Sequence, residues 1–177
     1  MLKWLALAAI AAVGFGLQTP SSQSSKPFGG TEDVAFARDT WKAMKGYENW
    51  KLTTKIYKGA SPHGKWVRLY STFIKVRGKS YAIIVKDNYG GRGATPERIA
   101  KDPHKWLKAI TVMIRREAGY DAPNQDWFWA KFSPDGEIDK NSKGMRLAGR
   151  VAKGMSRGCI SCHSQAGDDD YLFSNDR

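Results

Sequence analysis

The chain has 177 residues, of which 41% are hydrophobic and 26% charged, a composition typical of one folded globular domain and not of a disordered or fibrous chain. Lysine and arginine number 29 against 17 aspartates and glutamates, so the formal net charge is +12. The only two cysteines, Cys159 and Cys162, are close neighbours in the sequence. A bridge between them would barely constrain the unfolded chain, which excludes a disulfide-stapled secreted domain.

The N-terminal segment predicts export. Lys3 supplies a positive charge, residues 4–17 carry no polar side chain before Gln18, and Gly14 and Gly16 are small residues of the kind found at signal-peptide cleavage sites. The apolar run is shorter than the ~20 residues that span a bilayer. We therefore expect a signal peptide over residues 1–16 and a periplasmic mature chain without a transmembrane span. An uncleaved membrane anchor is the alternative.

The next segment, rich in Ser, Pro and Gly, predicts a flexible linker over residues 17–30, followed by a single domain over residues 31–177. Thr31, followed by two acids, marks the start of a helix that ends near Gly46. Aromatic and β-branched runs bounded by turn residues then predict about five strands. These runs are residues 50–57, 65–72, 80–87, 109–116 and 126–133.

Two further helices are expected. One is short, begins at Thr95 and is interrupted by Pro103; the other covers residues 141–157. On a helix, the basic residues of the second segment would form one stripe, either a docking surface for an acidic redox partner or simply a solvated face. They are Lys143, Arg146, Arg150, Lys153 and Arg157. The fold class is therefore α+β, a mainly antiparallel sheet with flanking helices.

The sequence Cys-Ile-Ser-Cys-His at residues 159–163 is the C-x-x-C-H attachment pattern of c-type haem. Cys159 and Cys162 would form thioethers with one haem c, and His163 would bind the iron on its proximal side. The fold would thus end in a C-terminal haem-binding helix. A thioredoxin-like dithiol is disfavoured by the position near the C-terminus. A zinc site would need another ligand, and His63 and His104 follow prolines in turns, where we expect surface residues.

The position of the motif near the C-terminus limits which residues could bind the iron on the side opposite His163. Residues 164–177 contain neither Met nor His, and the upstream methionines are expected to fill the core. We therefore expect five-coordinate iron, open to a small molecule. Phe73 and Phe132 are the aromatic candidates for the walls of that open side.

Four stretches, in this order and spacing, resemble the cytochrome P-460 family and its relatives, the cytochromes c′-beta. They are residues 63–70 (HGKWVRLY), residues 82–87 (AIIVKD), residues 127–129 with 133–136 (WFW and SPDG), and the haem motif followed by residues 170–173. The resemblance covers residues 41–173. It implies an antiparallel sheet that carries one c-type haem.

In cytochromes P-460 a lysine is bonded to the haem ring and the protein oxidises hydroxylamine, whereas the c′-beta relatives lack the bond and bind nitric oxide or other diatomics. Lys86 matches the bonded lysine. On a strand it shares a face with Ala82 and Ile84, so burial would lower the pKa of its amine and favour the nucleophilic form. The alternative is that Lys86 marks the solvated end of a strand.

One departure from the family pattern concerns proton transfer. Hydroxylamine-oxidising members have a pocket carboxylate shortly before the haem motif, but residues 140–167 contain no Asp or Glu here. A positioned base typically contributes 10²–10⁴-fold to rate. Asp87 or Glu117 would have to take this role, and fast hydroxylamine turnover is therefore in question.

These observations favour a periplasmic mono-haem cytochrome that acts on hydroxylamine or nitric oxide and passes electrons to a carrier protein. A non-enzymatic binder of diatomics and a simple electron-transfer cytochrome are the alternatives. The cations are spread along an exported chain, so nucleic acid is not an expected partner. A homodimer is compatible with the sequence.

Overall fold

A computed structural model describes residues 28–167 and 171–173. The expected signal peptide, residues 1–16, lies outside the described residues, as does the expected linker, residues 17–30, except for its last three positions. Phe28 at the end of that segment is buried, and the amide of Gly29 donates to the carbonyl of Ala148.

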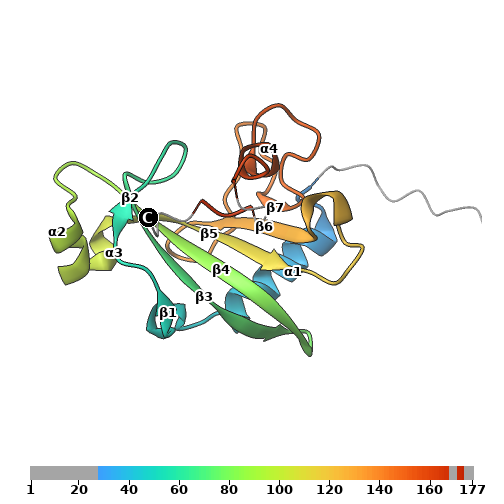
Figure 1. The fold of residues 1–177 in the computed structure, drawn as a ribbon, viewed down its shortest axis with the longest axis horizontal. Coiled ribbons are helices and arrows are strands. Elements are labelled where there is room, and N and C mark those ends of the chain that lie inside the picture. The colour runs from blue at the N-terminus through green and yellow to red at the C-terminus, as the bar shows by residue number, and fades with distance from the viewer. Residues whose placement is uncertain (1–27, 168–170, 174–177) are drawn as a thin grey trace, which may run out of the picture.

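The described chain forms one antiparallel sheet with helices on both faces (Figure 1). The strands are β1 (Leu52–Thr53), β2 (Tyr57–Lys58), β3 (Trp66–Val76), β4 (Lys79–Tyr89), β5 (Leu107–Arg115), β6 (Trp127–Phe132) and β7 (Ala148–Gly149). The helical segments are α1 (Thr31–Ala43), η1 (Tyr47–Asn49), α2 (Pro96–Lys101), α3 (Pro103–Trp106), η2 (Ala122–Asn124) and α4 (Cys159–His163). The strand order is β1-β3-β4-β5-β6-β7, and β2 also pairs with β3. The α+β class is confirmed.

Four of the five expected strand runs form the central strands β3 to β6. The run 50–57 instead gives the two short strands β1 and β2, which pair side by side with β3. Between β3 and β4, Arg77 and Gly78 both have positive φ, as the two-residue turn of a tight hairpin requires. The short helices α2 and α3 begin at Pro96 and Pro103, and the Thr95 side chain caps the first of them.

The helix expected over residues 141–157 is wrong. The segment consists of turns and β7, and Gly144, Gly149 and Gly154 all have positive φ, a conformation that interrupts a right-handed helix. The basic residues therefore do not form one stripe. Arg150 donates to the carbonyl of Tyr120, and Lys153 pairs with the buried Asp121.

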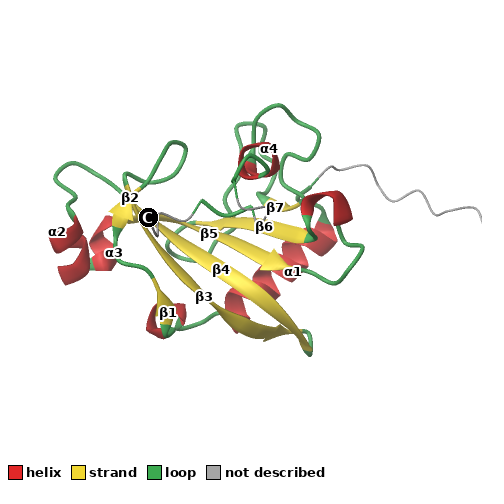
Figure 2. Cartoon of the chain, in the orientation of Figure 1, coloured by secondary structure: helices red, strands yellow, loops and turns green. Residues whose placement is uncertain are grey.

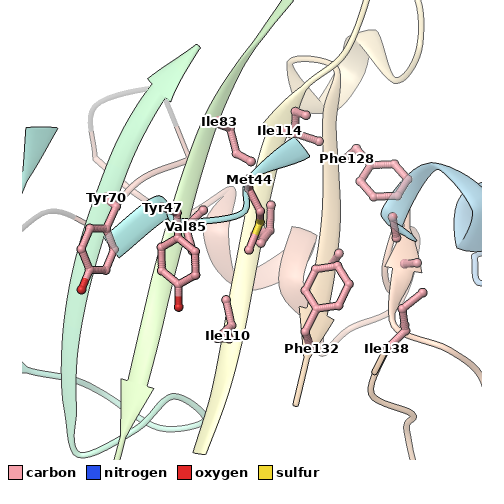
Figure 3. Packing of buried hydrophobic residues seen from close by; sticks show 14 of the residues in the cluster. Met44, Tyr47, Tyr70, Ile83, Val85, Ile110, Ile114, Phe128, Phe132 and Ile138 are labelled. Atoms are coloured by element: carbon pink, nitrogen blue, oxygen red, sulfur yellow. The ribbon is translucent and has the colours of Figure 1, made fainter. Parts of the chain in front are cut away.

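One face of the sheet forms the main core with α1. In register across β4, β5 and β6, the alternate positions Ile83, Ile114 and Phe128 lie side by side on this face. Figure 3 shows these residues packed with Met44 and Tyr47 from the segment that follows α1. The alternation of side chains along a strand thus commits every second residue of β4 to this core.

The opposite face carries a second apolar cluster. Ile84, Met113 and Trp129 lie in register on it, and Ile160 of α4 packs against them. Apart from α4, the chain that covers this face is made of loops (Figure 2). Among the described residues, every helix is too short or too polar to span a bilayer.

Candidate haem-binding site

The C-x-x-C-H residues make up the whole of α4, which lies near β6 and β7 (Figure 1). Ile160 and Cys159 of this helix pack in the second apolar cluster. Gly158 precedes the helix with φ of 149°, and a side chain there would overlap Ala152. The amide of Cys162 donates to the carbonyl of Gly158 at 3.1 Å, which closes the helical turn. Cys159 is half-buried and Cys162 exposed, both as free thiols.

His163 is held in an orientation suited to metal binding. Its side chain is buried, with 7% of the residue exposed, and its Nδ1 lies 2.6 Å from the carbonyl oxygen of Tyr171. A carbonyl can only accept, so Nδ1 carries the proton and Nε2 keeps a free lone pair. Burial lowers the pKa of His163 to about 4, which leaves the imidazole neutral at neutral pH, the form that binds metals.

Lys86 lies on the same face of the sheet as α4. It is half-buried and interacts electrostatically with Cys159 and Cys162. Burial lowers the pKa of its amine to about 8, with the two thiols acting in the opposite direction. The lysine therefore does not mark a solvated strand end, and a substantial fraction of the amine is unprotonated in mildly alkaline solution.

His63 is a site residue that sequence reasoning missed. It was expected on the surface, but the structure places it half-buried with its ring centre 6.0 Å from that of His163. Burial lowers the pKa of His63 to about 4, and the neighbouring Lys86 and Lys131 act in the same direction. Its position after Pro62 in a turn suggested a surface residue, but a turn between two strands can fold back over a sheet face and bury its side chains.

The residues considered as substitutes for a pocket carboxylate lie on the other face. Asp87 alternates with Lys86 along β4 and accepts hydrogen bonds from Tyr47 and Tyr89 at 2.6 and 2.7 Å. Glu117 pairs with Arg116 and accepts from the Tyr81 hydroxyl. Neither is therefore positioned beside α4.

The aromatic wall residues were also assigned wrongly. Phe132 is fully buried in the main core on the α1 side, and Phe73 is 75% exposed on β3. The aromatic residues that do contact His163 are Trp129, at 4.8 Å between ring centres, and Phe173, at 5.5 Å. The alternation of side chains along β6 explains the error for Phe132, since Trp129 and Phe132 lie on opposite faces.

Comparison with known protein families shows to which family this chain belongs. Residues 44–174 match the family model described as cytochrome P460. The chain belongs to the cytochrome P460 family. It is therefore a haem cytochrome, as the resemblance in the sequence implied. Neither the curated proteins nor the solved structures yield a match.

The side chains around α4 fit the haem c of a cytochrome P460. Two thiols and a histidine with a free Nε2 are the groups that would attach the haem and bind its iron. The apolar cluster supplies a hydrophobic surface for a porphyrin. Within the described chain, the buried indole nitrogens Nε1 of Trp127 and Trp129 have no hydrogen-bond partner. Buried donors are normally satisfied, and carboxylates such as the haem propionates would accept from them.

Proposed function

We propose that this cytochrome P460 is a periplasmic mono-haem protein that oxidises a small nitrogen compound, hydroxylamine or nitric oxide, and passes the electrons to a carrier protein. Cys159 and Cys162 would hold the haem, and His163 would bind its iron. When bound, the haem supplies one-electron redox chemistry at the iron. The protein contributes a buried, apolar environment on the α4 side of the sheet.

The observation that carries this proposal is the position of Lys86. Lys86 lies on the α4 face of β4, where its half-buried amine interacts electrostatically with the two cysteines and burial lowers its pKa to about 8. We propose that Lys86 forms the family's bond to the haem ring. The bond would replace one amine hydrogen and one ring hydrogen with a nitrogen–carbon link, a two-electron oxidation in which a peroxide takes up the two electrons and two protons and leaves as water.

Peptide mapping of the purified holoprotein tests this bond. After digestion, the peptide that contains Lys86 should remain attached to the haem peptide that contains Cys159 and Cys162. The ferrous absorption band should be shifted strongly to the red, and Lys86→Ala should lose the shift. Release of an unmodified Lys86 peptide, together with an ordinary c-type spectrum, would show that there is no bond.

Lys131→Ala is the matched control. Lys86 pairs with Thr111, and Thr111 pairs with Lys131, so the two lysines occupy one row on the same face of the sheet. Lys131 is paired with Asp139 at 2.7 Å. The control variant should keep the cross-linked peptide and the shifted band, because Lys131 already has an acidic partner.

A second function, reversible binding of nitric oxide without turnover, is favoured by the positions of the acids. Oxidation of hydroxylamine releases protons, and Asp87 and Glu117 are both on the far face of the sheet. Steady-state assays with hydroxylamine and an electron acceptor distinguish the two functions. Many turnovers per haem support the oxidase, whereas binding spectra without turnover support the nitric oxide binder.

A further inference from the structure

The loop that carries His63 is fixed to the haem side of the sheet. It connects β2 to β3 and is closed by a hydrogen bond from the Gly59 amide to the Lys65 carbonyl at 2.9 Å. A methyl group at Gly64 would lie 2.5 Å from the carbonyl oxygen of Tyr89 and 2.6 Å from its nitrogen. Such close contact shows that the loop rests directly on the end of β4, next to His63.

The two histidine rings have the separation of two ligands on opposite sides of one metal. Their centres are 6.0 Å apart and their planes make an angle of 84°. Two imidazoles in that arrangement, each about 2.0 Å from the metal and with a ring centre roughly 1.1 Å beyond the nitrogen, have centres about 6 Å apart. A histidine that only donated a hydrogen bond to a metal-bound ligand would lie roughly 2 Å farther away.

The surroundings of His63 match those of a metal-bound histidine. Metal-binding histidines generally use the second ring nitrogen to donate a hydrogen bond that orients the ring. His163 does so toward the Tyr171 carbonyl. The Asn88 side chain interacts with His63, and its buried Oδ1 has no hydrogen-bond partner among the described residues. It is therefore available as the corresponding acceptor.

We propose that His63 is the second axial ligand of the haem iron in the resting protein, opposite His163. This inference rests on the proposed function, since it requires the haem. It replaces the expectation of five-coordinate iron, and it means that a small nitrogen compound has to displace His63 before it reaches the metal. The loop of residues 59–65 would then control access to the iron.

The test is the spin state of the ferric holoprotein, measured by electron paramagnetic resonance and visible absorption. The wild type should be low-spin, as two imidazole ligands produce, and His63→Ala should be high-spin. The control His104→Ala removes an exposed histidine within α3 and should leave the low-spin signal unchanged. Imidazole added to His63→Ala should restore that signal.

Two results would overturn the inference. One is a high-spin wild type, and the other is a low-spin signal that persists in His63→Ala without imidazole. If His63→Ala does not fold, His63→Met provides the second variant, because a thioether ligand shifts the absorption spectrum while the iron stays low-spin; an unchanged wild-type spectrum would refute ligation by His63. Failure of the proposed function is recognised separately, because the purified protein would then lack covalently attached haem in its intact mass.

Discussion

Replacement of Asp87 tests the polar network that is buried beneath the sheet. The residue is 3% exposed, and each of its carboxylate oxygens accepts a hydrogen bond from a buried tyrosine, Tyr47 or Tyr89. Asp87→Ala leaves both hydroxyls without this acceptor, at about 1–3 kcal/mol each. A cavity of about 400 Å³ borders the three residues and admits water, so the expected total is near the lower end, about 2–4 kcal/mol.

Asp87→Asn separates these hydrogen bonds from the charge. Its amide oxygen keeps an acceptor for one of the two hydroxyls, whereas its NH₂ group can only donate, so Asp87→Ala should be about 1–3 kcal/mol less stable than Asp87→Asn in urea unfolding of the holoprotein followed by circular dichroism. Burial raises the pKa of Asp87 above 3.8. The fold therefore favours the protonated acid, and the contribution of this group to stability falls as the pH rises through the raised pKa.

The Asn variant lacks that titration, so its stability relative to the wild type should increase with pH. The comparison is made by urea unfolding of both proteins at several pH values from acidic to neutral. Equal stability of Asp87→Ala and Asp87→Asn, or a difference between wild type and Asp87→Asn that does not change with pH, would refute the reasoning.

Three further predictions concern the core, one turn and the haem attachment. Phe128→Ala empties a fully buried position of the main core and should lower the unfolding free energy by about 3–5 kcal/mol. Gly136 has φ of 90° and no room for a side chain beside the Trp41 indole, whereas Gly119 has a similar φ in open space. Gly119→Ala should lower the unfolding free energy by about 1–2 kcal/mol, and Gly136→Ala should lower it by more. Equal losses in urea unfolding would contradict the steric clash at Gly136. Cys162→Ser should keep the haem through one thioether, with the pyridine haemochrome band at longer wavelength, and loss of the haem on acid extraction would contradict attachment through Cys159.

The sheet was predictable from the sequence because its strands alternate and are bounded by turn residues. The run 65–72 and the run 80–87 became β3 and β4, and the alternation at Lys86 and Asp87 placed the two side chains on opposite faces as expected. The helix over residues 141–157 could not be judged from its charge spacing, since three glycines in left-handed conformations break it.

The candidate haem motif could be found from the sequence, because C-x-x-C-H is a local pattern of neighbouring residues. The proximity of His63 to His163 could not be predicted, because the two residues are 100 positions apart in the sequence. Their contact depends on how the β2–β3 loop folds back onto β4. The close approach of Gly64 to Tyr89 creates that contact, and a single sequence carries no signal of which strand a glycine will touch.

The unequal covering of the two sheet faces has a consequence for the order of assembly of the molecule. The face toward α1 is completed by elements that precede residue 139 together with β7, and it includes most of the buried residues. The other face is closed by α4, a helix of five residues near the C-terminal end, and by loops. Regions held by few regular contacts open most readily. In the proposed holoprotein, Cys159 and Cys162 would stay accessible while the rest of the molecule is already built, and covalent capture of the porphyrin would be the step that closes the second face.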